Sequence, residues 1–116
     1  MSTWQTAENE VFAALSKVAE THHVAMNGTP GEGDMIVFRI ARESVTTESD
    51  VPIMSTIYID AYVYQYTYKP AVMDDVVAAL NAAGWMAMRG EQTLDGGYYR
   101  DTISAVKRYN YSLEGE

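Results

Sequence analysis

The stretch Thr56-Ile57-Tyr58-Ile59-Asp60-Ala61-Tyr62-Val63-Tyr64-Gln65-Tyr66-Thr67-Tyr68-Lys69 alternates between small aliphatic residues and tyrosines. Successive side chains of a β-strand point to opposite faces of the sheet, so this alternation predicts one long strand with two different faces. One face is aliphatic and suits a core. The other face carries what we call the tyrosine row, which contains five of the nine tyrosines of the chain: Tyr58, Asp60, Tyr62, Tyr64, Tyr66 and Tyr68.

The tyrosine row is a candidate interface. A tyrosine ring is large and apolar but ends in a hydrogen-bonding hydroxyl, and such residues are enriched where proteins meet. Five exposed tyrosines on one strand would form an unusually apolar patch, so we expect another subunit to cover the row. The alternative is a solvated sheet face on which cross-strand aromatic pairs stabilise the sheet without any partner.

The segments on either side of this strand predict the rest of the fold. Apolar residues at helical spacing and residues that favour strands indicate two helices, over residues 2–21 and 70–83, and three further strands, over residues 35–41, 85–93 and about 101–113. Gly84 is a natural residue to end the second helix, and Asp95-Gly96-Gly97 indicates a turn. We expect one α+β domain over residues 1–116, with a mainly antiparallel four-stranded sheet and both helices packed on one face.

Two polar connections carry acidic residues that we expect to contact partners. The first, residues 27–34, contains Glu32 and Asp34. The second, residues 43–52, contains Glu43, Glu48 and Asp50. Ten residues are long for a tight hairpin, so the second connection is expected to be a mobile loop or a partner contact.

Composition and charge exclude several classes of protein. Sixteen acidic residues against eight basic ones give a net charge of −8, which opposes binding to a nucleic-acid backbone because the cations are dispersed. The absence of cysteine excludes disulfides and thiolate chemistry. The sequence shows no signal peptide and no apolar segment of membrane-spanning length. We therefore expect a soluble intracellular protein that binds neither membranes nor specific nucleic-acid sequences.

No residue set indicates catalysis, a metal or a cofactor. The adjacent His22 and His23 diverge on any regular element and lack further ligands, so we expect them at the end of the first helix. The spacing Gly28-x-x-Gly31-x-Gly33 lacks the lysine and hydroxyl of a phosphate-binding loop. Asp60 could be a general base with a raised pKa, but we expect it to hydrogen-bond a tyrosine hydroxyl or an arginine. We expect no enzyme.

Four stretches together suggest a family: Tyr58-Ile59-Asp60-Ala61-Tyr62-Val63-Tyr64, then Ala83-Gly84-Trp85, then Gly97-Tyr98-Tyr99-Arg100-Asp101-Thr102, and finally Lys107-Arg108-Tyr109-Asn110-Tyr111. With the first helix and the glycine-rich connection, this pattern resembles the tail terminator, or head–tail joining, proteins of long-tailed bacteriophages. The resemblance spans nearly the whole chain.

The resemblance implies a structural function. Members of that family form rings, commonly hexameric, that cap the completed tail tube and present a surface to the head. The implied partners are further copies of this chain, the tail tube and the head-completion proteins, and the implied location is the virion, assembled in the cytoplasm of the host bacterium. A ring needs two different patches on each subunit. The tyrosine row is then one candidate patch, and the acidic stretches 29–34 and 43–50 are candidates for contacts along the ring axis.

Two alternatives remain, and the first belongs to a different class of protein. The chain could be a small-molecule-binding or catalytic α+β domain, with a pocket against the tyrosines and Asp60 as its polar anchor. It could also be another virion component of similar fold, such as a head-completion or minor capsid protein.

Overall fold

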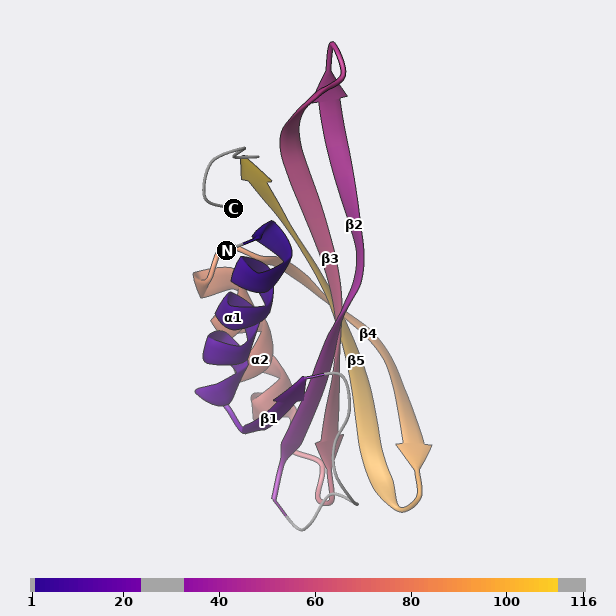
Figure 1. Ribbon diagram of the computed structural model, residues 1–116. Helices are drawn as coiled ribbons and strands as arrows, with labels where there is room; N and C mark the ends of the chain where they lie inside the picture. Colours follow the sequence, from indigo (N-terminus) through magenta and orange to yellow (C-terminus); the bar gives the residue numbers. More distant parts are fainter. Residues whose placement is uncertain (1, 24–32, 111–116) are drawn as a thin grey trace.

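In the computed structural model, which describes residues 2–23 and 33–110, two helices cover one face of a five-stranded mixed sheet (Figure 1). The strand order is β1-β2-β3-β5-β4, with β1 parallel to β2 and all other neighbours antiparallel. In chain order, the elements are α1 (Thr3–Ser16), β1 (Glu20–His23), β2 (Met35–Glu48), β3 (Val51–Gln65), α2 (Pro70–Ala82), β4 (Met86–Asp95) and β5 (Tyr98–Asn110). The α+β class is confirmed, but the sheet has five strands rather than four.

The alternation along β3 produces the two faces that the sequence predicts. From Ser55 to Gln65 every odd-numbered residue of β3 is buried, whereas the even-numbered residues between them are half-buried. The buried side chains meet apolar residues from both helices, including Val11 and Leu15 of α1 and Val76 and Leu80 of α2. The core therefore lies between the helices and one face of the sheet, and the opposite, outer face carries Tyr58, Asp60, Tyr62 and Tyr64.

The first helix is shorter than expected, and a short strand follows it. Ser2 caps α1: its side chain accepts a hydrogen bond from the backbone N–H of Gln5, whose own side chain accepts from the backbone of Ser2. The helix ends at Ser16, and residues 20–23 pair with β2 as the parallel edge strand β1. Our prediction of a helix to residue 21 was therefore wrong at its C-terminal end.

The ends of α2 and the last turn agree with the sequence. Pro70 lies in the first turn of α2. Gly84 follows the helix at a φ of +92°, and the N–H of Trp85 donates to the carbonyl of Leu80 at 2.9 Å. Gly96 and Gly97 have φ values of +60° and +87° and join β4 to β5 in a two-residue turn. Residues 111–113 of the predicted last strand lie outside the described residues.

The second polar connection is not a loop but a projecting hairpin. β2 continues to Glu48 and β3 begins at Val51, so only Ser49 and Asp50 form the turn, at φ values of 52° and 65°. The β-branched residues of Val45-Thr46-Thr47 favour a strand, and this preference outweighs the surrounding polar residues. Residues 44–54, which we call the arm, extend past the helix layer in Figure 1, and the molecule measures 51 × 24 × 21 Å.

Candidate functional site

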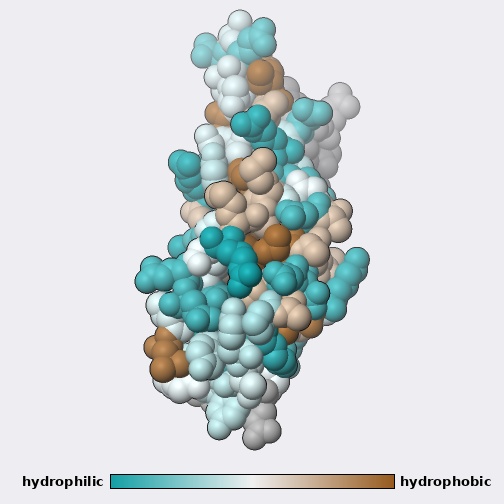
Figure 2. Space-filling model, turned by 180° about the vertical axis from the view of Figure 1, so that it is seen from behind, coloured by the Kyte–Doolittle hydropathy of each residue, from teal (hydrophilic) through white to brown (hydrophobic). Residues whose placement is uncertain are grey.

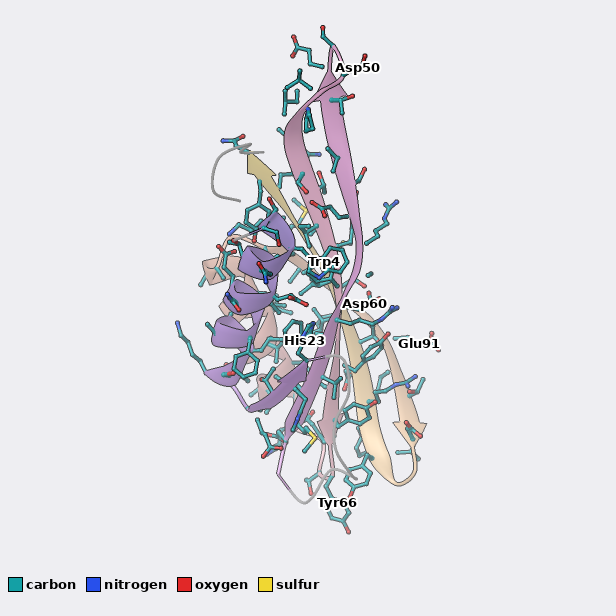
Figure 3. The ribbon with its side chains drawn as sticks, in the orientation of Figure 1. Trp4, His23, Asp50, Asp60, Tyr66 and Glu91 are labelled. Carbon is teal, nitrogen blue, oxygen red and sulfur yellow. The ribbon has the colours of Figure 1, made fainter. Side chains whose placement is uncertain are left out.

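The outer face of the sheet is organised around Asp60. Register places Asp60 of β3 directly between Arg39 of β2 and Ser104 of β5. Arg39 Nη2 donates to Asp60 Oδ2 at 3.2 Å, and Ser104 Oγ donates to Oδ1 at 3.2 Å. The expectation that Asp60 hydrogen-bonds an arginine is confirmed. Both carboxylate oxygens are engaged, so Asp60 links three strands near the middle of the sheet (Figure 3).

Arginines cover part of the tyrosine row. The guanidinium of Arg42 lies 4.1 Å from the centre of the Tyr58 ring, and that of Arg100 lies 5.6 Å from the centre of the Tyr62 ring. Tyr62, and then the Asp60 carboxylate, raise the pKa of Arg39 above its ordinary value. The row is therefore a mixed aromatic and cationic surface rather than a continuous apolar patch.

The row is also shorter than expected. β3 ends at Gln65, and the bend that follows breaks the alternation of faces. Tyr66 lies beyond the strand, 54% exposed, with its ring 5.8 Å from that of Tyr98. Tyr68 packs against the core, and its hydroxyl accepts a hydrogen bond from Arg89 at 3.4 Å. Our placement of Tyr68 on the outer face was wrong.

Two adjoining hollows lie on the outer face beside the edge strand β4. One has a volume of about 200 Å³ and is lined mainly by Tyr58, Asp60, Met86, Met88, Ser104 and Val106. The other, of about 450 Å³, shares Tyr58, Met86 and Val106, and its lining also includes Lys107 and Arg108. We call the pair the edge hollow. Met86 and Met88 are 67% and 61% exposed, so the edge hollow offers an accessible apolar surface with cations beside it.

The arm exposes a second apolar surface. Val45, Val51 and Ile53 are between 42% and 47% exposed. Val45 lies on the face that the helices cover lower down the sheet, because it pairs with the buried Ser55. Ile53 is passed over by a register shift of the hairpin, and Val51 pairs with Glu48 beyond that shift. The core face of the sheet thus continues onto the arm beyond the reach of the helices. In Figure 2, apolar side chains also appear as a separate patch towards the tip of the molecule.

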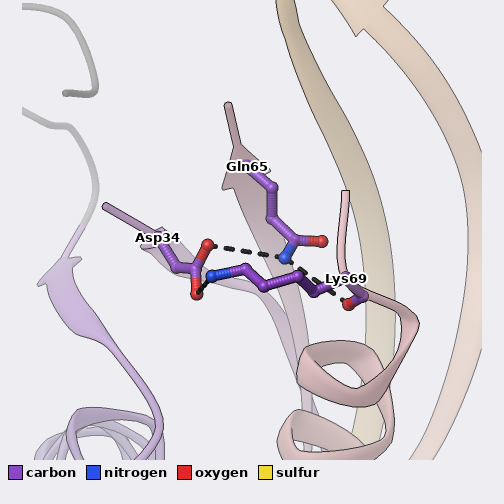
Figure 4. Close-up of polar contacts among 3 residues, drawn as sticks. All are labelled: Asp34, Gln65 and Lys69. Carbon is purple, nitrogen blue, oxygen red and sulfur yellow. Dashed lines mark hydrogen bonds and ion pairs between the residues drawn. The ribbon is translucent and has the colours of Figure 1, made fainter. Parts of the chain in front are cut away.

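The acidic residues that we expected to meet partners divide into two groups. Asp34 binds within the chain, with Lys69 Nζ 3.0 Å from Oδ2 and Gln65 Nε2 3.4 Å from Oδ1 (Figure 4). Glu43 accepts a hydrogen bond from the buried Ser55 at the base of the arm. Those two therefore stabilise the fold.

The second group stays accessible. Glu48 and Asp50 are exposed at the tip of the arm, where Figure 3 shows Asp50. These two residues remain candidates for partner contacts. Glu32 lies outside the described residues.

The histidines are on β1 rather than at a helix end, which corrects our prediction. His22 Nε2 lies 2.8 Å from a Glu20 carboxylate oxygen, and His23 Nε2 lies 2.7 Å from one of Glu8. The His23 ring also stacks on Phe38 at 4.9 Å. Across residues 2–23 and 33–110, no group of three His, Cys, Asp or Glu side chains is placed to hold a metal ion.

Sequence reasoning missed the two apolar surfaces. The alternation of Met86 and Met88 with Ala87 is visible in the sequence, but the edge hollow needs the register of β3, β5 and β4 as well. The sequence predicts a loop over residues 43–52, and a loop has no defined face on which exposed apolar side chains could be expected. The only available signal was the run Val45-Thr46-Thr47, which favours a strand.

Compared with protein-family models and with curated proteins, the chain matches none of them. Neither helix in the described part of the chain is long and apolar enough to cross a membrane. The function has therefore to be inferred from the surfaces themselves.

Proposed function

We propose that the chain is a structural subunit that assembles with copies of itself into a ring. Like the tail terminator and head–tail joining proteins that its sequence resembles, it would cap a bacteriophage tail tube and join the tube to the head. Its partners would be further copies of the chain, together with tail-tube and head-completion proteins. It would bind neither a membrane nor a specific nucleic-acid sequence. The proposed location is the virion, with assembly in the cytoplasm of the host.

The observation that carries this proposal is the arm. A two-stranded hairpin is marginally stable on its own in water, and an exposed apolar strand invites pairing with another chain. The arm nevertheless exposes the aliphatic side chains of Val45, Val51 and Ile53 past the end of the helix layer. Contact with another subunit would remove these side chains from water and stabilise the arm.

Ring closure adds a requirement that the molecule can meet. A closed ring larger than a dimer is built from head-to-tail contacts, in which one patch of each subunit meets a different patch of its neighbour. The outer face and the arm are separate surfaces with different chemistry, one rich in tyrosine and arginine and the other aliphatic and acidic. Both are candidates for such patches.

The oligomeric state of the purified chain tests the proposal. Light scattering coupled to size-exclusion chromatography, and sedimentation equilibrium over a range of concentrations, should show one closed oligomer of fixed mass. Electron microscopy of that species should show a ring. A species with the 12.9 kDa mass of the monomer at every concentration would contradict the proposal.

A second candidate function rests on the smaller hollow next to Asp60. At about 200 Å³ it lies below the volume of roughly 300–1,000 Å³ that is usual for small-molecule sites. Both carboxylate oxygens of Asp60, the residue that would anchor a ligand, also already accept hydrogen bonds from Arg39 and Ser104. A ligand screen by thermal shift distinguishes this function: a ligand that stabilises the native chain but not the Asp60→Asn variant would favour it over assembly.

A further inference from the structure

The arm and the edge hollow carry side chains of complementary chemistry. The arm is a narrow projection with three exposed aliphatic side chains, Val45, Val51 and Ile53, and two exposed acids at its tip, Glu48 and Asp50. The edge hollow is a depression lined by Tyr58, Met86, Met88 and Val106, with Arg108 at its border. Apolar side chains could therefore meet apolar side chains while the acids of the tip approach a basic border.

The cations beside the edge hollow are available for such a contact. Arg42 stacks on Tyr58, which lines both hollows, and Arg108 lines the larger one. Among the described residues, neither Arg42 nor Arg108 forms an ion pair. Lys107 is different, because its Nζ is held by Glu10 at 2.7 Å and by the carbonyl of Ala83 at 2.9 Å. In a chain of net charge −8, two unpaired arginines beside an apolar depression favour an acidic partner.

We propose that the arm of one subunit docks in the edge hollow of the next, so that Val51 and Ile53 pack against Met86 and Met88 while Asp50 and Glu48 face Arg108 and Arg42. This inference rests on the proposed function, since it names the two surfaces that make the contact within a ring. The contact is head-to-tail: every subunit supplies one arm and one hollow, and neither surface needs to meet a copy of itself.

Geometry within the subunit supports an arm that reaches a neighbour. The tip of the arm and the edge hollow of the same chain lie at different places on one sheet: the arm extends β2 and β3 beyond the helices, and the hollow lies across β3, β5 and β4. Val45 of the arm also lies on the helix side of the sheet, because it pairs with the buried Ser55, whereas the hollow lies on the outer side. A second copy is consequently required to bring the two surfaces together.

Complementation between two defective variants tests the proposal. The arm variant carries Val51→Asp and Ile53→Asp, and the hollow variant carries Met88→Asp; all three side chains are exposed, so the fold should tolerate the changes. Each variant alone should lose assembly and remain at 12.9 kDa. Mixed together, they should form a dimer of twice that mass, because the hollow variant still has an arm and the arm variant still has a hollow.

The control is Leu94→Asp, which introduces the same charge at a 70% exposed residue of the same strand, β4, that lines neither hollow. This variant should assemble like the native chain. Formation of the mixed dimer would itself show that both variants are folded. A charge exchange gives a second readout: Asp50→Lys and Arg108→Glu should each weaken assembly, and their combination in one chain should restore it.

The possible results separate this inference from the proposed function. If the native chain assembles and both variants assemble equally well, the arm–hollow contact is wrong while a ring subunit remains supported. If the arm variant fails but the hollow variant assembles and no mixed dimer forms, the arm meets a different surface, and the inference is overturned. A native chain that is monomeric at every concentration would overturn both.

Discussion

Replacing Tyr109 by phenylalanine would test the polar cluster that joins β5 to both helices. The Tyr109 hydroxyl donates to Glu10 Oε1 of α1 at 2.6 Å, and Lys107 Nζ donates to the same oxygen at 2.7 Å. Lys107 Nζ also donates at 2.9 Å to the carbonyl of Ala83, at the end of α2. The substitution removes one of the two hydrogen bonds to Glu10 and leaves the aromatic ring against Trp85 in place.

The magnitude follows from the type of hydrogen bond and its exposure. A hydrogen bond to a charged group contributes about 1.5–3 kcal/mol to stability. The Glu10 side chain is 34% exposed, so water can replace part of the lost bond, and we expect Tyr109→Phe to lower the free energy of unfolding by about 1–2 kcal/mol. For a domain of this size, that corresponds to a fall in Tm of about 4–8 °C.

The effect should depend on pH in a defined direction. Burial, followed by the hydrogen bond and the negative charge of Glu10, raises the pKa of Tyr109 well above its ordinary value of 10.0. Because the folded pKa is higher than the unfolded one, this stabilisation is complete below about pH 10 and is lost as the pH rises through the folded value. The stability difference between the native chain and Tyr109→Phe should therefore stay constant near neutrality and narrow above about pH 10.

Urea unfolding followed by circular dichroism, at neutral and at alkaline pH, measures this difference. Tyr66→Phe is the matched control, because Tyr66 is exposed and its loss of a hydroxyl should leave stability unchanged. In the folded protein, the rise in ultraviolet absorbance that accompanies tyrosine ionisation near pH 10 should be the same for the native chain and for Tyr109→Phe, because the raised pKa of Tyr109 keeps its hydroxyl protonated there. Equal stability of Tyr109→Phe and the native chain at neutral pH would refute the reasoning.

Three further substitutions test the backbone and the core by urea unfolding. Gly84→Ala should cost about 1–2 kcal/mol, because a φ of +92° strains any residue with a Cβ and because the new Cβ would lie 3.2 Å from the Lys107 side chain, which Glu10 and Ala83 hold in place. Ser49→Gly should stabilise the turn of the arm by about 0.5–1 kcal/mol, since its φ is 52°; a loss of stability would contradict this. Ile59→Ala should cost about 2–5 kcal/mol because Ile59 is fully buried in the central strand, and a smaller effect would mean that the core collapses around the gap.

Local patterns predicted those parts of the fold that depend on neighbouring residues alone. The alternation from Ile57 to Val63 predicts a two-faced strand because side-chain direction in a strand has a period of two. The helix from Pro70 and the turn at Gly96-Gly97 follow from the backbone preferences of proline and glycine. The hydrogen bonding of Asp60 was predictable as a type of contact, because a half-buried carboxylate needs donors.

Elements that depend on a distant partner were not predictable. Residues 20–23 form β1 only because β2 offers its edge for pairing, and the histidines in this segment carry no strong strand signal. Tyr68 continues the alternation in the sequence, yet the bend after Gln65 turns it towards the core. The edge hollow requires three strands in register, which no single segment of sequence specifies.

The sequence by itself determined that β3 has an aliphatic face and a tyrosine face, because alternation is a property of the strand alone. Only the tertiary structure decided how far each face is covered. The helices end before the sheet does, so the same face of the sheet is core at Ile57 and exposed surface at Val45. Arginines from β2 and β5 lie over Tyr58 and Tyr62, so the tyrosine face is partly covered from within the subunit. Burial depends on the lengths and positions of other elements, and these are set by packing across the whole chain.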